Sequence, residues 1–360
     1  MGIYLAYMFS PIIVYAVITF LYKKPIGESD SMRHKYLIIC GVIIFMMLAC
    51  RDHTVGSSDA TWYFNNWVYL SQVPANEFWD VSSRFDMERG YLFSVWLLSH
   101  IFNNPQFLFI LYGLLVAVSI IRFLYLNCEN VVLGVVMFNC LGLWGFMAQG
   151  IRQGIAMCIC LFALEYCKQR KFIKFILHIA LAMLFHASAI AFIVVYFLPR
   201  LKMDVKGYFV VGIGAFICAL CLDDLFGLFN LVMNDAYTTN DIYSTSGGFV
   251  STLIYCLIIF ATLLTYGRKK DNELDERMFF YMLCCGFLLF VMRYSVNTIA
   301  QRVAYYYMFS QIPMLSMVLQ KFNNRDRAIS TIIVVCLCLG ITIYKASYSV
   351  LVPYVLFWQV

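Results

Sequence analysis

The sequence predicts an all-α, polytopic membrane protein that forms one domain over residues 1–360, and three observations predict this fold class. Hydrophobic residues make up 62% of the 360 residues, and charged residues make up only 13%. Soluble domains, in contrast, are about 25% charged. The mean hydropathy is +0.79. Apolar runs of about 17 to 25 residues, long enough to cross a bilayer as helices, recur along the chain.

These runs predict about ten transmembrane helices. The first run lacks the basic start of a cleavable signal peptide and is therefore interpreted as a span. A basic loop follows it, and the positive-inside rule assigns basic loops to the cytoplasm. In chain order the predicted spans are Ile3–Leu21, Tyr36–Cys50, Phe107–Leu124, Val131–Met147, Ile151–Cys167, Tyr208–Leu222, Phe249–Tyr266, Met278–Met292, Val303–Leu319 and Ala328–Tyr344.

Two apolar runs do not fit a simple crossing and are predicted to be re-entrant or broken. Gly90–Phe102 is about half a membrane long and stops at two asparagines and a proline, which is typical of a re-entrant or interfacial segment. Phe172–Leu198 has His186 and Ser188 near its middle and a basic loop at each end. If both loops are cytoplasmic, this run is a helical hairpin with His186 at its turn. The alternative is one long span that contains a buried histidine.

The distribution of charge favours two segments that do not cross. With the N-terminus outside, the basic loops lie in the cytoplasm, and the acidic loops at residues 51–89 and 223–248 lie outside. The formal net charge of +6 resides in short loops and does not indicate nucleic-acid binding. The 14 cysteines fall mostly within apolar runs, where they act as small hydrophobic residues. Their spacing predicts no disulfide framework and no metal site, and we expect no cofactor.

Residues 51–88 form the longest polar interval and contain the first candidate site residues. Carboxylates, arginines and flat aromatic rings are the groups needed to hold an anionic substrate that carries sugars and to move a proton. The alternative is a solvated loop with an aromatic belt at the membrane surface. The residues concerned are Arg51, Asp59, Trp62, Tyr63, Trp67 and Glu88.

Three further arginines lie at the ends of apolar runs: Arg152 and Arg302 begin spans, and Arg293 ends one. In the predicted topology all three lie near the extracytoplasmic ends of their helices, and His186 reaches the same level from the hairpin turn. Guanidinium groups bind phosphate oxygens through paired hydrogen bonds and keep their charge. Together these residues predict a site for a lipid pyrophosphate. The alternative is that each arginine extends towards lipid headgroups, which is common near helix ends.

Several short motifs occur in a characteristic order. RDHTVGSSDATWY at residues 51–63 is followed by MERGY, by IRQGIA, by FHASAI after a basic turn, by QRVAYYY and by the closing VPY. This order resembles the EpsG family, which is related to the Wzy-type O-antigen and capsule polymerases. The family pattern R-x-x-T-V-G-x-D-x-x-x-Y has one residue fewer between glycine and aspartate. Either Ser58 or Asp59 can therefore correspond to the aspartate of the family pattern.

The resemblance implies a fold similar to the metal-independent C class of membrane glycosyltransferases. It also implies an O-antigen or exopolysaccharide polymerase, with a role in lipopolysaccharide or other polysaccharide biosynthesis at the periplasmic face of the bacterial inner membrane. Such an enzyme transfers the growing glycan from undecaprenyl pyrophosphate to the next lipid-linked repeat unit. The implied partners are undecaprenyl-pyrophosphate-linked oligosaccharides, membrane lipid and a chain-length regulator.

In such a reaction, arginines stabilise the departing pyrophosphate and a histidine or carboxylate takes the proton of the attacking hydroxyl. Two alternatives remain: a ligase that moves finished chains to a lipid core, and a transporter of lipid-linked units, which needs the cations but no base. We expect unranked catalytic roles for His186, Asp59 and Glu88, pyrophosphate binding by Arg51, Arg152, Arg293 and Arg302, and sugar stacking by Trp62, Tyr63 and Trp67.

Overall fold

The computed structural model describes residues 1–56, 58–85, 87–220, 248–266, 273–292 and 298–359. Regular structure in these ranges is helical, without a strand, and one isolated antiparallel bridge joins Arg51 to Leu356. The predicted all-α class is therefore confirmed. The predicted outer loop at residues 223–248 lies outside the described residues except for Gly248, which begins a helix.

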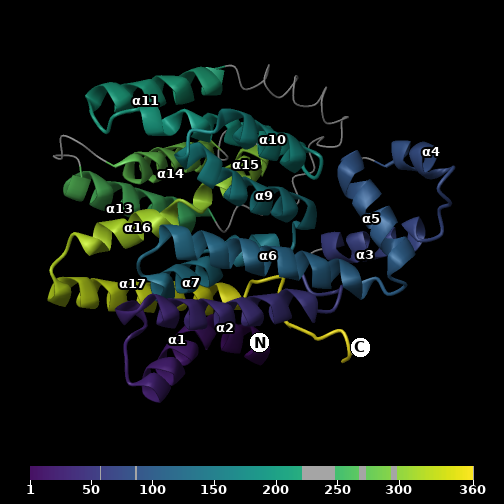
Figure 1. Cartoon of the computed structure of the whole chain (residues 1–360), viewed down its shortest axis with the longest axis horizontal. Coiled ribbons are helices and arrows are strands. Elements are labelled where there is room, and N and C mark those ends of the chain that lie inside the picture. The colour runs from purple at the N-terminus through teal and green to yellow at the C-terminus, as the bar shows by residue number, and fades with distance from the viewer. Residues whose placement is uncertain (57, 86, 221–247, 267–272, 293–297, 360) are drawn as a thin grey trace.

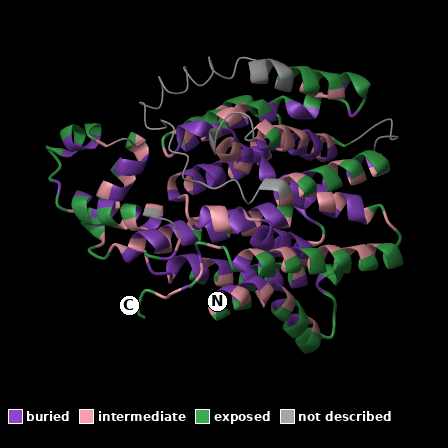
Figure 2. Ribbon diagram, turned by 180° about the vertical axis from the view of Figure 1, so that it is seen from behind, coloured by how far each residue is buried: buried purple, intermediate pink, exposed green. Residues whose placement is uncertain are grey.

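Four of the described helices are long and apolar enough to cross a membrane: α1 (Gly2–Tyr22), α2 (Asp30–Ala49), α6 (Gln106–Asn127) and α17 (Asn324–Ala346) (Figure 1). Helices α2 and α6 pack side by side. Large apolar side chains such as Phe20 of α1 and Ile332 of α17 are exposed on the outer faces of the bundle (Figure 2). Apolar surface of this extent is expected where helices face lipid rather than water.

Of the six other predicted spans, four correspond to continuous helices of 16 to 19 residues, and those at residues 131–147 and 303–319 are each interrupted. Between α7 and α8, Gly142 has φ +97°, a left-handed conformation that glycine adopts without a steric penalty. Between α15 and α16 the helix stops at Phe309 and Ser310, shortly before Pro313, which lacks the N–H that a continuous helix would use. The helices concerned are α7 (Val131–Cys140), α8 (Leu143–Met147), α9 (Ile151–Lys168), α11 (Val205–Leu220), α13 (Gly248–Tyr266), α14 (Leu274–Met292), α15 (Thr298–Met308) and α16 (Gln311–Gln320).

The run at residues 172–198 is a hairpin, as one of the two sequence interpretations predicted. Helix α10 (Phe172–Met183) leads to the turn, and the 3₁₀ segments η2 (Ala187–Tyr196) and η3 (Leu198–Arg200) lead back. At the returning end, the Tyr196 hydroxyl donates to the main-chain oxygen of Arg170 at 2.9 Å. The Tyr196 ring also lies 5.0 Å from the ring of Phe172. His186 is the residue before η2 and occupies the turn.

The polar interval at residues 51–88 is a folded lobe. It contains α3 (Ser58–Leu70) and α4 (Phe78–Ser83), and it continues into the short helix α5 (Arg89–Ile101). Figure 1 shows these three helices together at one side of the bundle. Their packing is specific: the Trp96 indole donates to the main-chain oxygen of Val73 at 2.8 Å, and its ring contacts that of Phe78. The lobe therefore holds its side chains in defined positions.

The hairpin can be tested by labelling cysteines from one side of the membrane. We expect Lys171→Cys and Lys202→Cys, which precede and follow the hairpin, to react with an impermeant maleimide from the same side. The background should carry alanine at the exposed Cys256 and Cys336. Labelling of the two positions from opposite sides would mean that the run crosses the membrane once.

Candidate active site

The carboxylate of Glu88 joins a guanidinium group and an imidazole from distant parts of the chain. Its Oε2 accepts a hydrogen bond from Arg152 Nη1 at 2.6 Å, and its Oε1 lies 2.8 Å from His186 Nδ1. Oε1 also accepts from the main-chain N–H of Ala187 at 3.1 Å. The Glu88 side chain is only 10% exposed, so these contacts replace the water that an ionised carboxylate otherwise needs. The contact with Oε1 assigns the neutral histidine the tautomer with its proton on Nδ1.

Close packing between the start of α5 and the hairpin turn positions this carboxylate. The main-chain N–H of Tyr91 donates to the oxygen of Leu184 at 3.1 Å. A β-carbon at Gly90 would lie 2.6 Å from both the β-carbon and the oxygen of Leu184, too close for any other residue. The MERGY sequence therefore serves two purposes: Glu88 supplies the charge, and Gly90 permits the close approach.

Helix α3 adds aromatic and acidic side chains to the site. The Tyr63 hydroxyl accepts from Arg152 Nε at 3.5 Å, and Tyr63 is buried against the ring of Tyr91. The Trp62 ring lies 5.9 Å from the guanidinium carbon of Arg152, within the range of a cation–π contact. Trp62 is 42% exposed, so part of its ring is open to a ligand. Asp59 lies one turn before Tyr63 and within electrostatic range of its hydroxyl.

Helix α15 brings Arg302 to the same cluster. The Gln153 side chain donates to the main-chain oxygen of Arg302 at 2.6 Å and so joins α9 to α15 next to Arg152. The charge of Arg302 lies within electrostatic range of both His186 and Tyr63. Two guanidinium groups therefore approach one imidazole and one carboxylate.

The local charges keep Glu88 ionised. Burial alone would raise the pKa of this carboxyl group, but the hydrogen bond from His186 and the charges of His186 and Arg152 outweigh burial and lower the pKa to about 2. Glu88 is therefore an anion at any physiological pH. A group held this acidic orients its neighbours and is a poor acceptor for a substrate proton.

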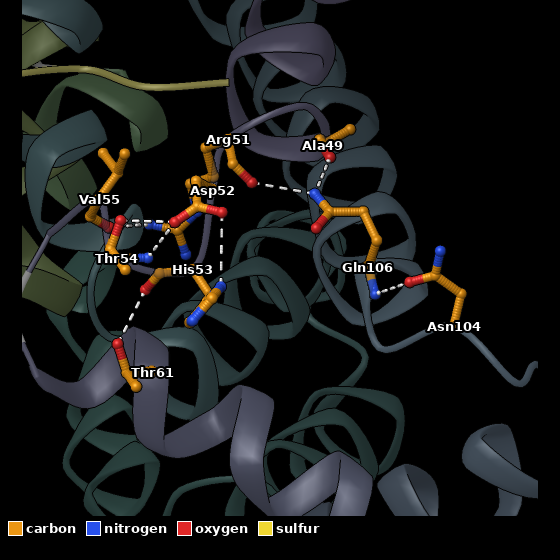
Figure 3. A network of polar contacts seen from close by, with 9 residues as sticks. All are labelled: Ala49, Arg51, Asp52, His53, Thr54, Val55, Thr61, Asn104 and Gln106. Atoms are coloured by element: carbon orange, nitrogen blue, oxygen red, sulfur yellow. Dashed lines mark hydrogen bonds and ion pairs between the residues drawn. The ribbon is translucent and has the colours of Figure 1, made fainter. Parts of the chain in front are cut away.

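Arg51 does not join this cluster, which differs from the expectation that it contacts pyrophosphate. Its side chain is completely buried, and its Nη1 donates to the main-chain oxygens of Ala148 and Val55. The Gln106 amide donates to the main-chain oxygen of Arg51 at 3.0 Å, and Asp52 binds the N–H of Thr54 at 2.9 Å (Figure 3). This network has no exposed guanidinium surface for a ligand. Arg51 instead ties the end of α2 to the turn before α9.

The C-terminal segment covers the same region. The main-chain N–H of Asp52 donates to the main-chain oxygen of Val355 at 3.0 Å, and the N–H of Phe357 donates to the main-chain oxygen of Cys50 at 3.0 Å. The Tyr354 hydroxyl, in the VPY motif, donates to the main-chain oxygen of Met47. Two motifs at opposite ends of the chain therefore meet in a structural contact.

Two of the predicted site residues, Trp67 and Arg293, are not part of the described cluster. Trp67 is 1% exposed, so the expectation that it stacks on a sugar is wrong. Tyr306 and Tyr307 are also buried, and Tyr305 stacks on Phe146 with ring centroids 3.7 Å apart. Arg293 lies outside the described residues, and its predicted role stays a prediction.

Sequence reasoning missed several residues that support the cluster. Gln153 directly follows Arg152 in the IRQGIA motif, and this adjacency could have identified it. Ser188 was noted only as a polar residue near the turn; its hydroxyl lies 3.2 Å from that of Tyr306 and fixes the hairpin against α15. Leu184 carries no sequence signal, because its contribution is a main-chain oxygen.

The side chains present suit acid–base and phosphate chemistry. Within the described ranges, no group of three or more His, Cys, Asp or Glu side chains is placed to hold a metal ion. The cluster instead combines guanidinium groups, an oriented imidazole and a partly exposed indole. These groups can bind an anion, accept a proton and contact a sugar ring.

The fold and this cluster define a polytopic helical membrane protein with a charged site where the lobe, α9, α15 and the hairpin turn meet. The profile of the EpsG family matches residues 34–356, a range that includes every residue of the cluster, and the chain belongs to the EpsG family. This membership indicates a polysaccharide-polymerase-like role in a membrane. Comparisons with curated proteins and with solved structures give no match.

Replacing Glu88 should destabilise the protein, because Arg152 would lose its buried anionic partner. We expect Glu88→Gln to lower the free energy of unfolding by about 3 kcal/mol. Asp80→Asn is the matched control, since Asp80 pairs with Arg84 at 2.5 Å but both side chains are about 70% exposed. The control should change the same free energy by less than about 0.5 kcal/mol. Equal effects in a denaturant titration of the detergent-solubilised protein would contradict the central role of Glu88.

The lowered pKa of Glu88 also predicts how stability depends on pH. Its pKa is about 2 in the folded protein and 4.5 ordinarily, so its stabilising effect is complete above about pH 4.5 and is lost as the pH falls to about 2. The difference in unfolding free energy between the wild type and Glu88→Gln should therefore shrink by about 3 kcal/mol over this interval. Measurements of the unfolding free energy from pH 7 to pH 2 check this prediction. If the difference between the two proteins stays constant, the partners of Glu88 do not lower its pKa.

Proposed function

We propose that this protein is an O-antigen or exopolysaccharide polymerase. It transfers the growing glycan from undecaprenyl pyrophosphate to the next lipid-linked repeat unit on the extracytoplasmic face of the bacterial inner membrane. The observation that carries the proposal is the Glu88 carboxylate held between Arg152 and His186. This contact places a cation suited to pyrophosphate beside an imidazole suited to proton transfer. Membership of the EpsG family supports the substrate class.

The leaving group is stabilised by guanidinium groups. As the bond between the anomeric carbon and the pyrophosphate oxygen breaks, that oxygen takes the electron pair and becomes more negative. Arg152 and Arg302 lie in the same cluster and keep their positive charge at every relevant pH. Fixed cations at the point where negative charge develops lower the barrier. In this mechanism the step needs no metal, and Arg293, which the sequence predicts at the same level of the membrane, assists.

His186 acts as the base. Its Nδ1–H donates to Glu88, so the lone pair of the neutral imidazole is on Nε2. Nε2 takes the proton of the acceptor hydroxyl while the hydroxyl oxygen forms the new bond to the anomeric carbon. Glu88 stabilises the imidazolium that results, which is the role of the carboxylate in histidine-based acid–base pairs generally. Attack opposite to the departing pyrophosphate inverts the anomeric configuration.

Trp62 and Asp59 contact the sugars in this proposal. The exposed part of the Trp62 ring lies beside Arg152 and offers a flat surface to a sugar ring adjoining the pyrophosphate. Asp59 lies on the same face of α3 as Tyr63, and its carboxylate can accept hydrogen bonds from sugar hydroxyls. Tyr63 is buried, so its role is to hold Arg152 in place.

A His186→Ala variant tests the assignment. We expect loss of polymer by at least about a hundredfold, which is the usual contribution of a general base. Single lipid-linked repeat units should accumulate on the outer face, because transport is intact. His178→Ala is the control: His178 lies on the same hairpin, but its Nδ1 bonds the main-chain oxygen of Lys174 rather than a carboxylate, and its ring packs against that of Tyr166. The control should make normal polymer.

The same assay separates the two alternatives. If the protein were a transporter, its inactivation would leave repeat units on the inner face of the membrane. If it were a ligase, its inactivation would leave polymer attached to the lipid carrier and no single repeat units on the outer lipid. Either result in the His186→Ala strain would overturn the proposed polymerase activity.

A further inference from the structure

The hairpin brings two basic loops together at the end of α9 that lies away from the proposed active site. Helix α9 has 18 residues and is about 27 Å long. Arg152 lies at its start, and Cys167 and Lys168 lie at its end. The hydrogen bond from Tyr196 to Arg170 places the loop after α9 beside the loop after η2. Basic residues that are about 30 positions apart in sequence therefore lie on one surface.

An open pocket lies between these two loops and the first residue of α14. It is a small, open depression in the surface, lined by Cys167, Arg170, Tyr196, Pro199, Arg200 and Leu274. The side chains of Cys167, Tyr196 and Pro199 are buried and form an apolar floor. The two arginines are exposed and lie at the rim. A cationic rim over an apolar floor suits a ligand that has both an anionic and an apolar part.

The two arginines have no carboxylate partner within the described parts of the chain. The nearby acids of α14 are paired with lysines instead: Asp275 lies 2.7 Å from Lys168, and Glu276 lies 3.7 Å from Lys321. No ion pair of Arg170 or Arg200 is formed with these acids. The rim therefore keeps a net positive charge that an external anion can satisfy.

The pocket walls are held in place before any ligand binds. The Arg200 guanidinium carbon lies 5.3 Å from the Tyr196 ring and 5.2 Å from the Phe197 ring, which restricts its position. The Tyr281 hydroxyl of α14 donates to the main-chain oxygen of Lys202 at 2.5 Å, which ties the loop after η3 to α14. A preformed site binds a ligand with a smaller loss of conformational entropy.

Exposed apolar side chains adjoin the pocket. Phe172 begins α10 and contacts the Tyr196 ring, and Phe197 follows η2 and lies beside the Arg200 guanidinium; both are exposed. They form a surface that acyl chains would cover. A free phosphate ion would gain nothing from these side chains, whereas a phospholipid would gain from both the rim and the apolar surface.

We propose that this pocket binds the phosphate group of an anionic phospholipid in the leaflet that the basic loops face. Arg170 and Arg200 bind the phosphate oxygens, Tyr196 and Pro199 contact the glycerol region, and the exposed rings of Phe172 and Phe197 contact the acyl chains. Basic pockets between membrane helices are suited to anionic headgroups for these reasons. The bound lipid would fix the hairpin against α14 at the end remote from His186.

The test is lipid retention by the full-length protein. The protein is extracted from vesicles of equal parts phosphatidylglycerol and phosphatidylcholine, and the lipids that remain bound are measured by native mass spectrometry. The wild type should retain phosphatidylglycerol preferentially. The Arg170→Gln/Arg200→Gln variant should lose this preference by roughly twentyfold, because each basic side chain near an anionic surface strengthens binding by roughly fivefold.

Two further variants keep the result interpretable. Lys23→Gln/Arg325→Gln removes the same charge from other exposed basic positions and should retain the wild-type preference. Arg170→Lys/Arg200→Lys keeps the charge and should restore most of the preference, which a purely structural role of the arginines would not predict. Retention that is unchanged in the glutamine variant, or equally lost in the control, would overturn the proposal. Displacement of the lipid by millimolar inorganic phosphate would show that the site binds free phosphate instead.

Discussion

The carboxylate of Glu88 is the constraint on which the arrangement of this site depends. A carboxylate that is taken out of water must find partners, since an unpaired buried charge is among the costliest features a fold can contain. Glu88 finds three: the guanidinium of Arg152, the imidazole of His186 and the N–H of Ala187. These partners belong to α9 and to the start of η2. The position of one side chain thus determines how α5, α9 and the hairpin turn are placed relative to one another.

The hairpin turn is suited to this contact for two reasons. The first N–H groups of a helical segment have no partner within the segment, and Ala187 is the first residue of η2. Its N–H is therefore available to Glu88. In addition, Gly90 lets the main chain of α5 approach Leu184 closely, so the carboxylate can reach both the imidazole and the N–H. Geometry of the main chain and charge of the side chains support each other here.

The sequence was sufficient to predict the fold class, it offered the hairpin as one of two interpretations, and it singled out Arg152, Glu88 and His186, which the structure brings together. Arg152, Glu88 and His186 are ionisable residues next to apolar runs, where each requires a partner, and this requirement is visible without a structure. The role of Arg51 was not visible, because its partner is the main-chain oxygen of Ala148 and its cover is the C-terminal segment. The interruptions at Gly142 and Ser310 were also not visible, since apolar composition does not distinguish a continuous helix from a broken one.

Helix α9 separates the charged site from the basic loops by most of the thickness of a hydrocarbon layer. Arg152 and Lys168 are 16 residues apart, which corresponds to about 24 Å along the helix, somewhat less than the roughly 30 Å of the hydrocarbon layer. Each end carries an ion pair, with Glu88 at one end and the more exposed Asp275 at the other. These two pairs hold α9 at both ends, with Arg152 and the His186 imidazole at one end and the basic loops at the other. Under the proposed function, a polyprenyl carrier reaches the Arg152 end with its pyrophosphate while its tail stays in lipid.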